Sequence, residues 1–242
     1  MFHSQCDVNV ITSKRKLTLK KLNVTLVCVL MLGVPAAIRL AGASAPKVTC
    51  DTCPVSGIDP KASTPFAKAD TSQGCKTRTK LGFPVPDPKC TPGAINPTVT
   101  LEVLQNPSFK TGCIRDCATK ETDKNVTYGF YSIPHPKVNT GENQVCELDH
   151  LVSLELGGAD TLDNIWPQCG PASETDLNRR YFKQKDLVEN YLAARVKSGK
   201  MKLADVQKGI ATDWTQYLQQ AKKFCVGNPI TCGIAKPAQP GL

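Results

Sequence analysis

The sequence has few histidines, few aromatic residues and, after its first 45 residues, no long apolar run. Three histidines, His3, His135 and His150, occur in 242 residues, and Phe, Trp and Tyr together make up 6% of the chain. Zinc sites combine closely spaced cysteine or histidine pairs. Cys50 and Cys53 have such a spacing, but no second close pair and no paired histidines complete a site, so disulfide bonding is favoured over the zinc alternative.

The one long apolar run, LNVTLVCVLMLGVPAAI, covers residues 22–38. Five lysines and arginines precede it closely, and the small residues AGASA follow it. This order is typical of a secretory signal peptide and predicts cleavage after Ala43 or Ala45. An uncleaved membrane anchor at 1–45 is the alternative, although the run is short for a membrane span. We expect a secreted or periplasmic protein with no stable membrane association after signal cleavage.

The chain has no large excess of positive charge once this leader is set aside. Residues 1–45 carry six of the lysines and arginines and one aspartate, so their removal lowers the net charge from +9 to +4. A net charge of +4 is compatible with a phosphate-rich partner but does not indicate one. Ten cysteines remain, and an even number on an exported chain is typical of disulfide bonds. The short separation along the sequence is the only reason to favour a disulfide bond between Cys225 and Cys232.

Two regions of different composition follow the leader. Residues 46–97 are rich in Pro, Gly, Ser, Thr and Lys, which predicts a loop-rich segment stabilised by disulfides. Residues 98–242 are predicted to form one domain with a supporting C-terminal helix. Within this domain, TVTLEVL (98–104) and VTYGFYSI (126–133) have the composition of strands.

A strand, a turn and a second strand are predicted from residue 144 onward. QVCELDHLVSLEL (144–156) alternates and is rich in Val and Leu, a Gly-Gly pair follows it, and DNIW (163–166) begins the second strand. Cys146 and Cys169 bracket the two strands. A bridge between them would pin both strands, although their separation does not establish one.

A helix is predicted after the hairpin. Ser173 and Asp176 resemble a capping box, and apolar residues at helical spacing continue to an end near Gly199. A second amphipathic helix is predicted from about Leu203 to Phe224, packing as support. The order strand, strand, helix predicts an α+β fold.

Several separated pieces of this sequence occur in the order typical of one nuclease family. The pair Asp149-His150 begins DHLVSLELGG and stands 14 residues before the Asn164 of NIWPQ. KDLVE follows in the predicted helix, and CTPGAINPTVT (90–100) precedes the hairpin. Residues 83–195 or so resemble HNH (ββα-metal) endonucleases, most of all their exported bacterial branch. The resemblance implies a ββα-metal core and hydrolysis of DNA or RNA phosphodiester bonds.

The resemblance also implies roles for three residues. His150 would take a proton from the attacking water, and its ordinary pKa near 6.5 leaves it largely neutral for that task. Asp149, on the other side of the strand's pleat, would face a divalent metal ion. Asn164 would brace the loop through hydrogen bonds from its side chain to the backbone.

One departure from the family pattern concerns the metal. HNH proteins commonly supply a further ligand, often histidine, from the helix, and this chain has no histidine after His150. Asp176, Asn178 and Asp186 are the candidate substitutes, although they cannot all reach one ion. Their oxygen atoms favour Mg²⁺ or Mn²⁺.

The predicted helix also has a basic flank. Arg179, Arg180 and Lys183 are candidates for binding nucleic-acid phosphates, and a solvated helix face is the alternative. In KDLVE, an ion pair from Lys185 to Glu189 would explain both residues structurally.

Two functions therefore remain open. The first is an exported, metal-dependent HNH-type endonuclease with little sequence selectivity, because base-reading elements are not evident. The second is a catalytically inactive, exported binding or structural module on an HNH-like scaffold.

Overall fold

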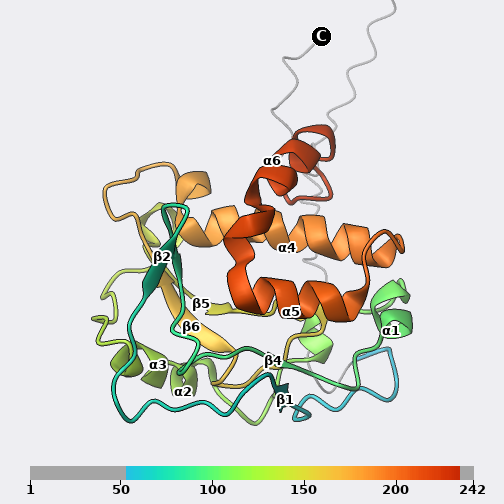
Figure 1. The fold of residues 1–242 in the computed structure, drawn as a ribbon, viewed down its shortest axis with the longest axis horizontal. Coiled ribbons are helices and arrows are strands. Elements are labelled where there is room, and N and C mark those ends of the chain that lie inside the picture. Colours follow the sequence, from blue (N-terminus) through green and yellow to red (C-terminus); the bar gives the residue numbers. More distant parts are fainter. Residues whose placement is uncertain (1–52, 235–242) are drawn as a thin grey trace, which may run out of the picture. The chain divides into compact units, whose positions relative to one another are not determined.

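The computed structural model describes residues 53–234, in which helices are mixed with three small antiparallel sheets (Figure 1). The predicted combination of helices and strands is therefore confirmed. The described residues belong to one compact unit, Ala45–Leu242. The predicted signal peptide or anchor at 1–45 lies outside the described residues, as does Cys50. Within residues 53–234, no helix has both the length and the apolar character needed to cross a membrane.

The region before residue 98 is mostly loop, as predicted, and its strands are two or three residues long. β1 (Thr64–Pro65) pairs with β4 (Ala94–Ile95), and β2 (Arg78–Lys80) pairs with β3 (Phe83–Val85). Both pairs are antiparallel. Such short strands bury little surface, so this region depends on crosslinks and on packing against the rest of the unit.

Disulfides provide those crosslinks. The bridge favoured from sequence separation at the C-terminal end is confirmed, and so is the one across the hairpin. Cys117 is disulfide-bonded as well. Four disulfides join described residues to each other: Cys53–Cys113, Cys75–Cys90, Cys146–Cys169 and Cys225–Cys232.

Two segments with strand composition are helical, so their prediction as strands is wrong. Residues 98–104 overlap α1 (Leu101–Gln105), and residues 126–133 contain α3 (Val126–Phe130). The Thr100 hydroxyl caps α1 by accepting a hydrogen bond from the third helical N–H. Strand propensity depends on a neighbouring strand, and here local turns satisfy the backbone instead.

The predicted hairpin is present and is built from two five-residue strands. β5 (Cys146–His150) pairs antiparallel with β6 (Ile165–Cys169), which places Asp149 opposite Trp166. The first strand ends at His150, earlier than its alternating sequence predicts. Beyond His150 the chain turns through a short 3-10 helix, Leu154–Leu156, and Gly158 then lies so close to Val152 that a Cβ atom on it would lie 1.8 Å from the Val152 carbonyl oxygen.

Three helices follow the hairpin. α4 (Tyr181–Lys197) begins later than its sequence predicts, because Asp176 caps a separate short turn of 3-10 helix. The predicted second helix is broken into α5 (Leu203–Asp213) and α6 (Leu218–Gly227) by another turn of 3-10 helix.

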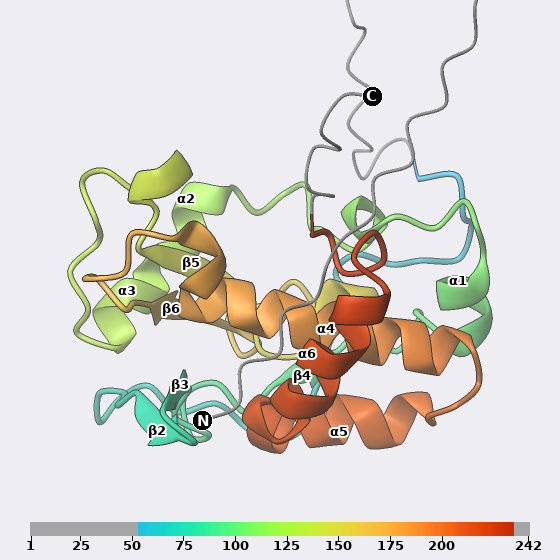
Figure 2. The ribbon, with the colours of Figure 1, turned by 90° about the horizontal axis from the view of Figure 1, so that it is seen from above.

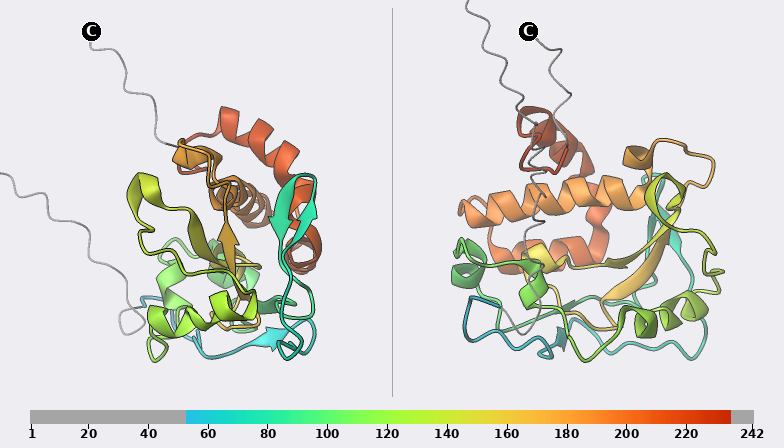
Figure 3. Two further views of the ribbon diagram at one scale, coloured as in Figure 1. Left: turned by 90° about the vertical axis from the view of Figure 1, so that its left-hand side faces the viewer. Right: turned by 180° about the vertical axis from the view of Figure 1, so that it is seen from behind.

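The α4 helix is the central element around which the core assembles. It packs against α5 and α6 on one side and against β5 and β6 on another (Figures 2 and 3). Apolar burial on this scale is the main stabilising force of such a core. The buried residues of these helices include Phe182, Val188, Leu192, Val196, Val206, Ile210 and Trp214.

Candidate active site at the end of the hairpin

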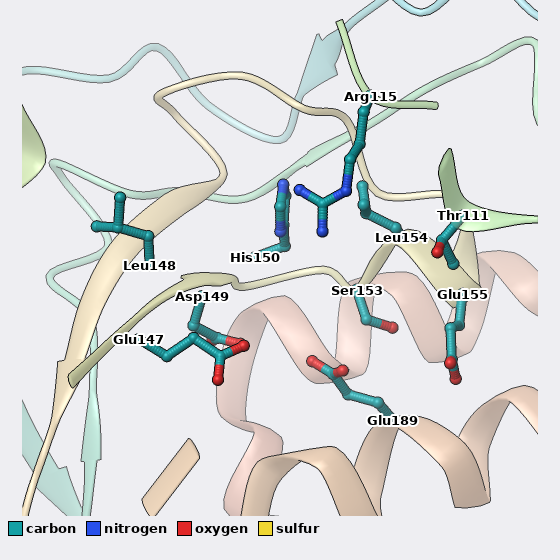
Figure 4. Close-up of a pocket in the computed structure, with 10 residues that line it drawn as sticks. All are labelled: Thr111, Arg115, Glu147, Leu148, Asp149, His150, Ser153, Leu154, Glu155 and Glu189. Carbon is teal, nitrogen blue, oxygen red and sulfur yellow. The ribbon is translucent and has the colours of Figure 1, made fainter. Parts of the chain in front are cut away.

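A small cavity of about 150 Å³ lies where β5 ends, and we call it the β5 cavity (Figure 4). Its lining combines four carboxyl groups with an imidazole and a guanidinium, so it is polar and rich in ionisable groups. It is lined by Thr111, Arg115, Glu147, Leu148, Asp149, His150, Ser153, Leu154, Glu155 and Glu189.

His150 is held by a buried carboxylate. Its Nε2 lies 2.7 Å from Oδ1 of Asp160, whose side chain is fully buried. The Lys124 ammonium, from α2 (Glu121–Lys124), donates to both oxygens of Asp160 at 2.7 and 2.9 Å. Burial alone would raise the pKa of Asp160, but its contacts with His150 and Lys124 outweigh burial and hold that pKa well below its usual range. Asp160 is therefore ionised.

The ionised partner fixes the hydrogen position on the ring of His150. A carboxylate accepts hydrogen bonds and donates none, so Nε2 carries the hydrogen and the neutral ring has its lone pair on Nδ1. Burial lowers the pKa of His150, and the opposing contact with Asp160 does not cancel this effect. The ring is thus neutral near pH 7, and the Arg115 guanidinium lies beside it (Figure 4).

Asp149 points to the opposite side of the strand, toward α4. Its Oδ1 and Oδ2 lie 3.1 and 3.0 Å from Nζ of Lys185, and Oδ2 also accepts from Nε1 of Trp166 at 3.0 Å. Lys185 is 0% exposed. Its ammonium also donates to the backbone oxygen of His150 at 2.8 Å and to the carboxylate of Glu189. The ion pair expected between Lys185 and Glu189 is confirmed.

The carboxyl groups around the β5 cavity are difficult to ionise. Burial, strengthened by neighbouring acids, raises the pKa of Glu147 to about 7. Burial likewise raises the pKa of Glu155 and Asp149, and it raises the pKa of Glu189 well above its ordinary value. The cavity therefore carries less negative charge near pH 7 than its composition suggests.

Asn164 makes the side-chain to backbone hydrogen bonds that were expected of it. Its amide nitrogen donates to the carbonyl oxygens of Val152 and Ala159 at 2.9 and 2.8 Å. Its amide oxygen accepts from the N–H groups of Val152 and Ala94 at 2.9 and 3.3 Å. The side chain is completely buried. Asn164 thus joins two positions of the loop that follows His150 to β4.

The oxygen ligands predicted on the helix side lie elsewhere. Asn178 and Asp186 line a different cavity, of about 590 Å³, together with Lys183. Asp186 accepts from Lys183 at 2.8 Å, and Asp176 caps the turn before α4. The structure does not bring Asn178 to the cavity that Asp149 lines.

The three predicted phosphate-binding residues also lie outside the lining of the β5 cavity. Arg179 is exposed, and its guanidinium lies 3.6 Å from Asp176. Arg180 is buried and donates to the carbonyl oxygen of Pro171. Their role as nucleic-acid contacts stays a prediction, as does that of Lys183.

The donor set around Asp149 does not fit the divalent ion that the HNH resemblance implies. Both oxygens of Asp149 are already engaged by an ammonium. Among residues 53–234, no group of three or more His, Cys, Asp and Glu side chains is arranged to hold a metal ion.

Four residues that the structure places at this site have only weak signals in the sequence. Asp160 follows the Gly-Gly pair and resembles ordinary turn chemistry. Lys124 and Arg115 come from segments with no motif, and Ser153 is a single hydroxyl within an apolar stretch. Ser153 is 2% exposed, and its hydroxyl lines the β5 cavity without a hydrogen-bond partner.

No protein-family model, curated protein or solved structure matches the chain. The resemblance to HNH endonucleases therefore rests on the quoted motifs, and function is inferred from the geometry of the β5 cavity.

Proposed function

We propose that the protein is an exported endonuclease whose β5 cavity hydrolyses phosphodiester bonds of DNA or RNA. The observation that carries the proposal is the 2.7 Å contact between His150 and Asp160 beside Arg115. It supplies an oriented neutral base next to a permanent positive charge, the two groups that phosphodiester hydrolysis requires.

The proposed reaction uses water as the nucleophile. Nδ1 of His150 takes a proton from the water as its oxygen attacks phosphorus, and Asp160 stabilises the imidazolium that forms. The guanidinium of Arg115 binds the non-bridging oxygens as negative charge grows on them. The bond from phosphorus to the leaving oxygen breaks, and that oxygen takes a proton from solvent.

The surrounding elements support an HNH-like ββα core. The order β5, β6, α4 follows the family pattern, Asn164 ties the loop behind His150, and Asp149 faces the helix. The disulfides support export, because such crosslinks persist in oxidising compartments.

The acidic lining of the β5 cavity favours the second candidate, a catalytically inactive binding or structural module on the same scaffold. Four carboxyl groups repel a phosphate wherever they are ionised. Because burial raises the pKa of Glu147 to about 7 and also raises that of Glu189, this repulsion is weakest below neutral pH. Cleavage should therefore persist at mildly acidic pH.

The two candidates are separated by nicking of a supercoiled plasmid and by cleavage of a single-stranded RNA. We expect the purified, disulfide-bonded protein to cleave at least one of them. His150→Ala should lower the rate by about 10² to 10⁴, the usual contribution of a general base. His135→Ala is the matched control, because His135 is exposed, packs edge to face against Tyr128 and is not part of the cavity lining.

Equal urea denaturation curves for the two variants would show that the loss is chemical. Cleavage that survives His150→Ala, or no cleavage by the wild type from pH 5 to 8, would favour the inactive module.

A further inference from the structure

The junction between β5 and α4 is built around a buried cation. The Lys185 ammonium lies within 3.1 Å of both Asp149 oxygens and of the backbone oxygen of His150, and it also contacts the Glu189 carboxylate. All of these partners are oxygen atoms, and they come from the strand and from the helix. Hard divalent ions in proteins gather ligands of the same kind.

We infer that the Lys185 ammonium takes the place of the divalent ion that the HNH resemblance implies at Asp149. The lysine fixes Asp149, the end of β5 and α4 in one arrangement, as a shared metal ion would. This inference rests on the proposed function for its catalytic consequence, but its claim about metal binding stands on the contacts alone.

A second cation is disfavoured at the same carboxylate. Lys185 is 0% exposed, and a divalent ion on Asp149 would lie next to its positive charge. The remaining hydrogen bond to Asp149 comes from the Trp166 N–H, which is also buried. A metal ion would have to displace a donor that the surrounding packing holds in place.

Lys185 is a positioning residue and does not contact the substrate. Its side chain is absent from the lining of the β5 cavity, whereas Arg115 is part of that lining. Arg115 would therefore neutralise charge on the scissile phosphate, while Lys185 holds the strand and the helix together. In metal-dependent hydrolysis, one metal ion would perform both tasks. Cleavage should then proceed without added metal.

Mn²⁺ binding to the purified, disulfide-bonded chain tests the claim directly. By calorimetry and thermal denaturation, the wild type should bind no Mn²⁺ at Asp149. Lys185→Asn removes the ammonium and offers an amide oxygen beside Asp149 and Glu189, so it should gain a one-to-one Mn²⁺ site and a higher melting temperature with Mn²⁺. Lys197→Asn, at the exposed end of α4, is the matched control and should gain neither.

Folding of Lys185→Asn that depends on Mn²⁺ would support the inference as well. A one-to-one Mn²⁺ site in the wild type that Asp149→Asn removes would overturn it, and this measurement needs no Lys185 variant.

The cleavage assay supplies the second readout. Wild-type cleavage should change less than twofold in excess EDTA, and a loss greater than tenfold that Mn²⁺ restores would overturn the inference. If the wild type cleaves neither substrate under any condition, the proposed function fails, while Mn²⁺ binding still decides the role of Lys185.

Discussion

Two buried lysine and carboxylate centres flank the end of β5, and they differ in which group is shared. On one side, the Asp160 carboxylate is shared by the Lys124 ammonium and the His150 ring. On the other side, the Lys185 ammonium is shared by two carboxylates, those of Asp149 and Glu189. Asp149 and Asp160 are each at least nine-tenths buried.

This difference decides what each centre can do. Asp160 stays ionised because its partners outweigh burial, and it can therefore orient and stabilise the ring of His150. Burial raises the pKa values of Asp149 and Glu189, and the ammonium that they share does not cancel this effect. On one side of β5, His150 is thus oriented by an ionised carboxylate. On the other side, its neighbour Asp149 belongs to a structural junction between strand and helix.

The largest expected effect is a loss of stability at the Asp160 centre. Asp160→Asn leaves the buried Lys124 ammonium without this carboxylate and should cost about 3–5 kcal/mol of unfolding free energy. Asp149→Asn should cost less, about 1–3 kcal/mol, because Glu189 still neutralises Lys185. Urea denaturation at pH 7 measures both, with exposed Asp123→Asn as the control. Equal costs at the two centres would contradict the proposed difference between them.

A pH series on Glu147 sharpens the comparison, because this residue shares a strand face with Asp149. Its folded pKa of about 7 lies above the ordinary 4.5, so between these values the folded state binds more protons than the unfolded state. The wild type should therefore lose stability as the pH rises through this window. Glu147→Gln removes the contribution and should be more stable relative to the wild type at pH 8 than at pH 4.5.

Glu142→Gln is the control for this series, since Glu142 is exposed in a short turn of 3-10 helix. The assignment would be wrong if both variants showed the pH dependence of the wild type.

The smallest expected effect lies on the outer part of α4. Asp186 and Lys183 form an ion pair at 2.8 Å, but their side chains are about one third exposed. Asp186→Asn should change the unfolding free energy by about 0–1 kcal/mol, because solvent screens such pairs. Differential scanning calorimetry in low and high salt checks this value. A cost as large as that of Asp160→Asn would show that the partly exposed pair also behaves as a buried centre.

The sequence predicted the parts of the site that depend on local pattern. The hairpin follows from alternation and turn residues, the helix from apolar spacing, and the bracing by Asn164 from its place in the motif. The hairpin and the helix involve residues whose neighbours lie close along the chain or on the next strand, and most of the Asn164 hydrogen bonds go to the loop between β5 and β6.

The sequence could not predict the parts that depend on distant packing. Lys124 is 36 residues from Asp160, and Lys185 is 36 residues from Asp149, so neither pairing leaves a periodic signal. The prediction of strands at 98–104 and 126–133 is wrong for a related reason. These segments form helical turns and do not pair with another strand.

The disulfide across the hairpin has a consequence for the register of the two strands. Cys146 is paired with Cys169 at one end, and Asn164 is tied to the loop at the other. Displacing β5 by one residue along β6 would turn every side chain to the opposite face, so an imidazole would meet the lysine of α4 and a carboxylate would meet Asp160. A covalent clamp at one end and an amide at the other keep two neighbouring residues from exchanging their surroundings.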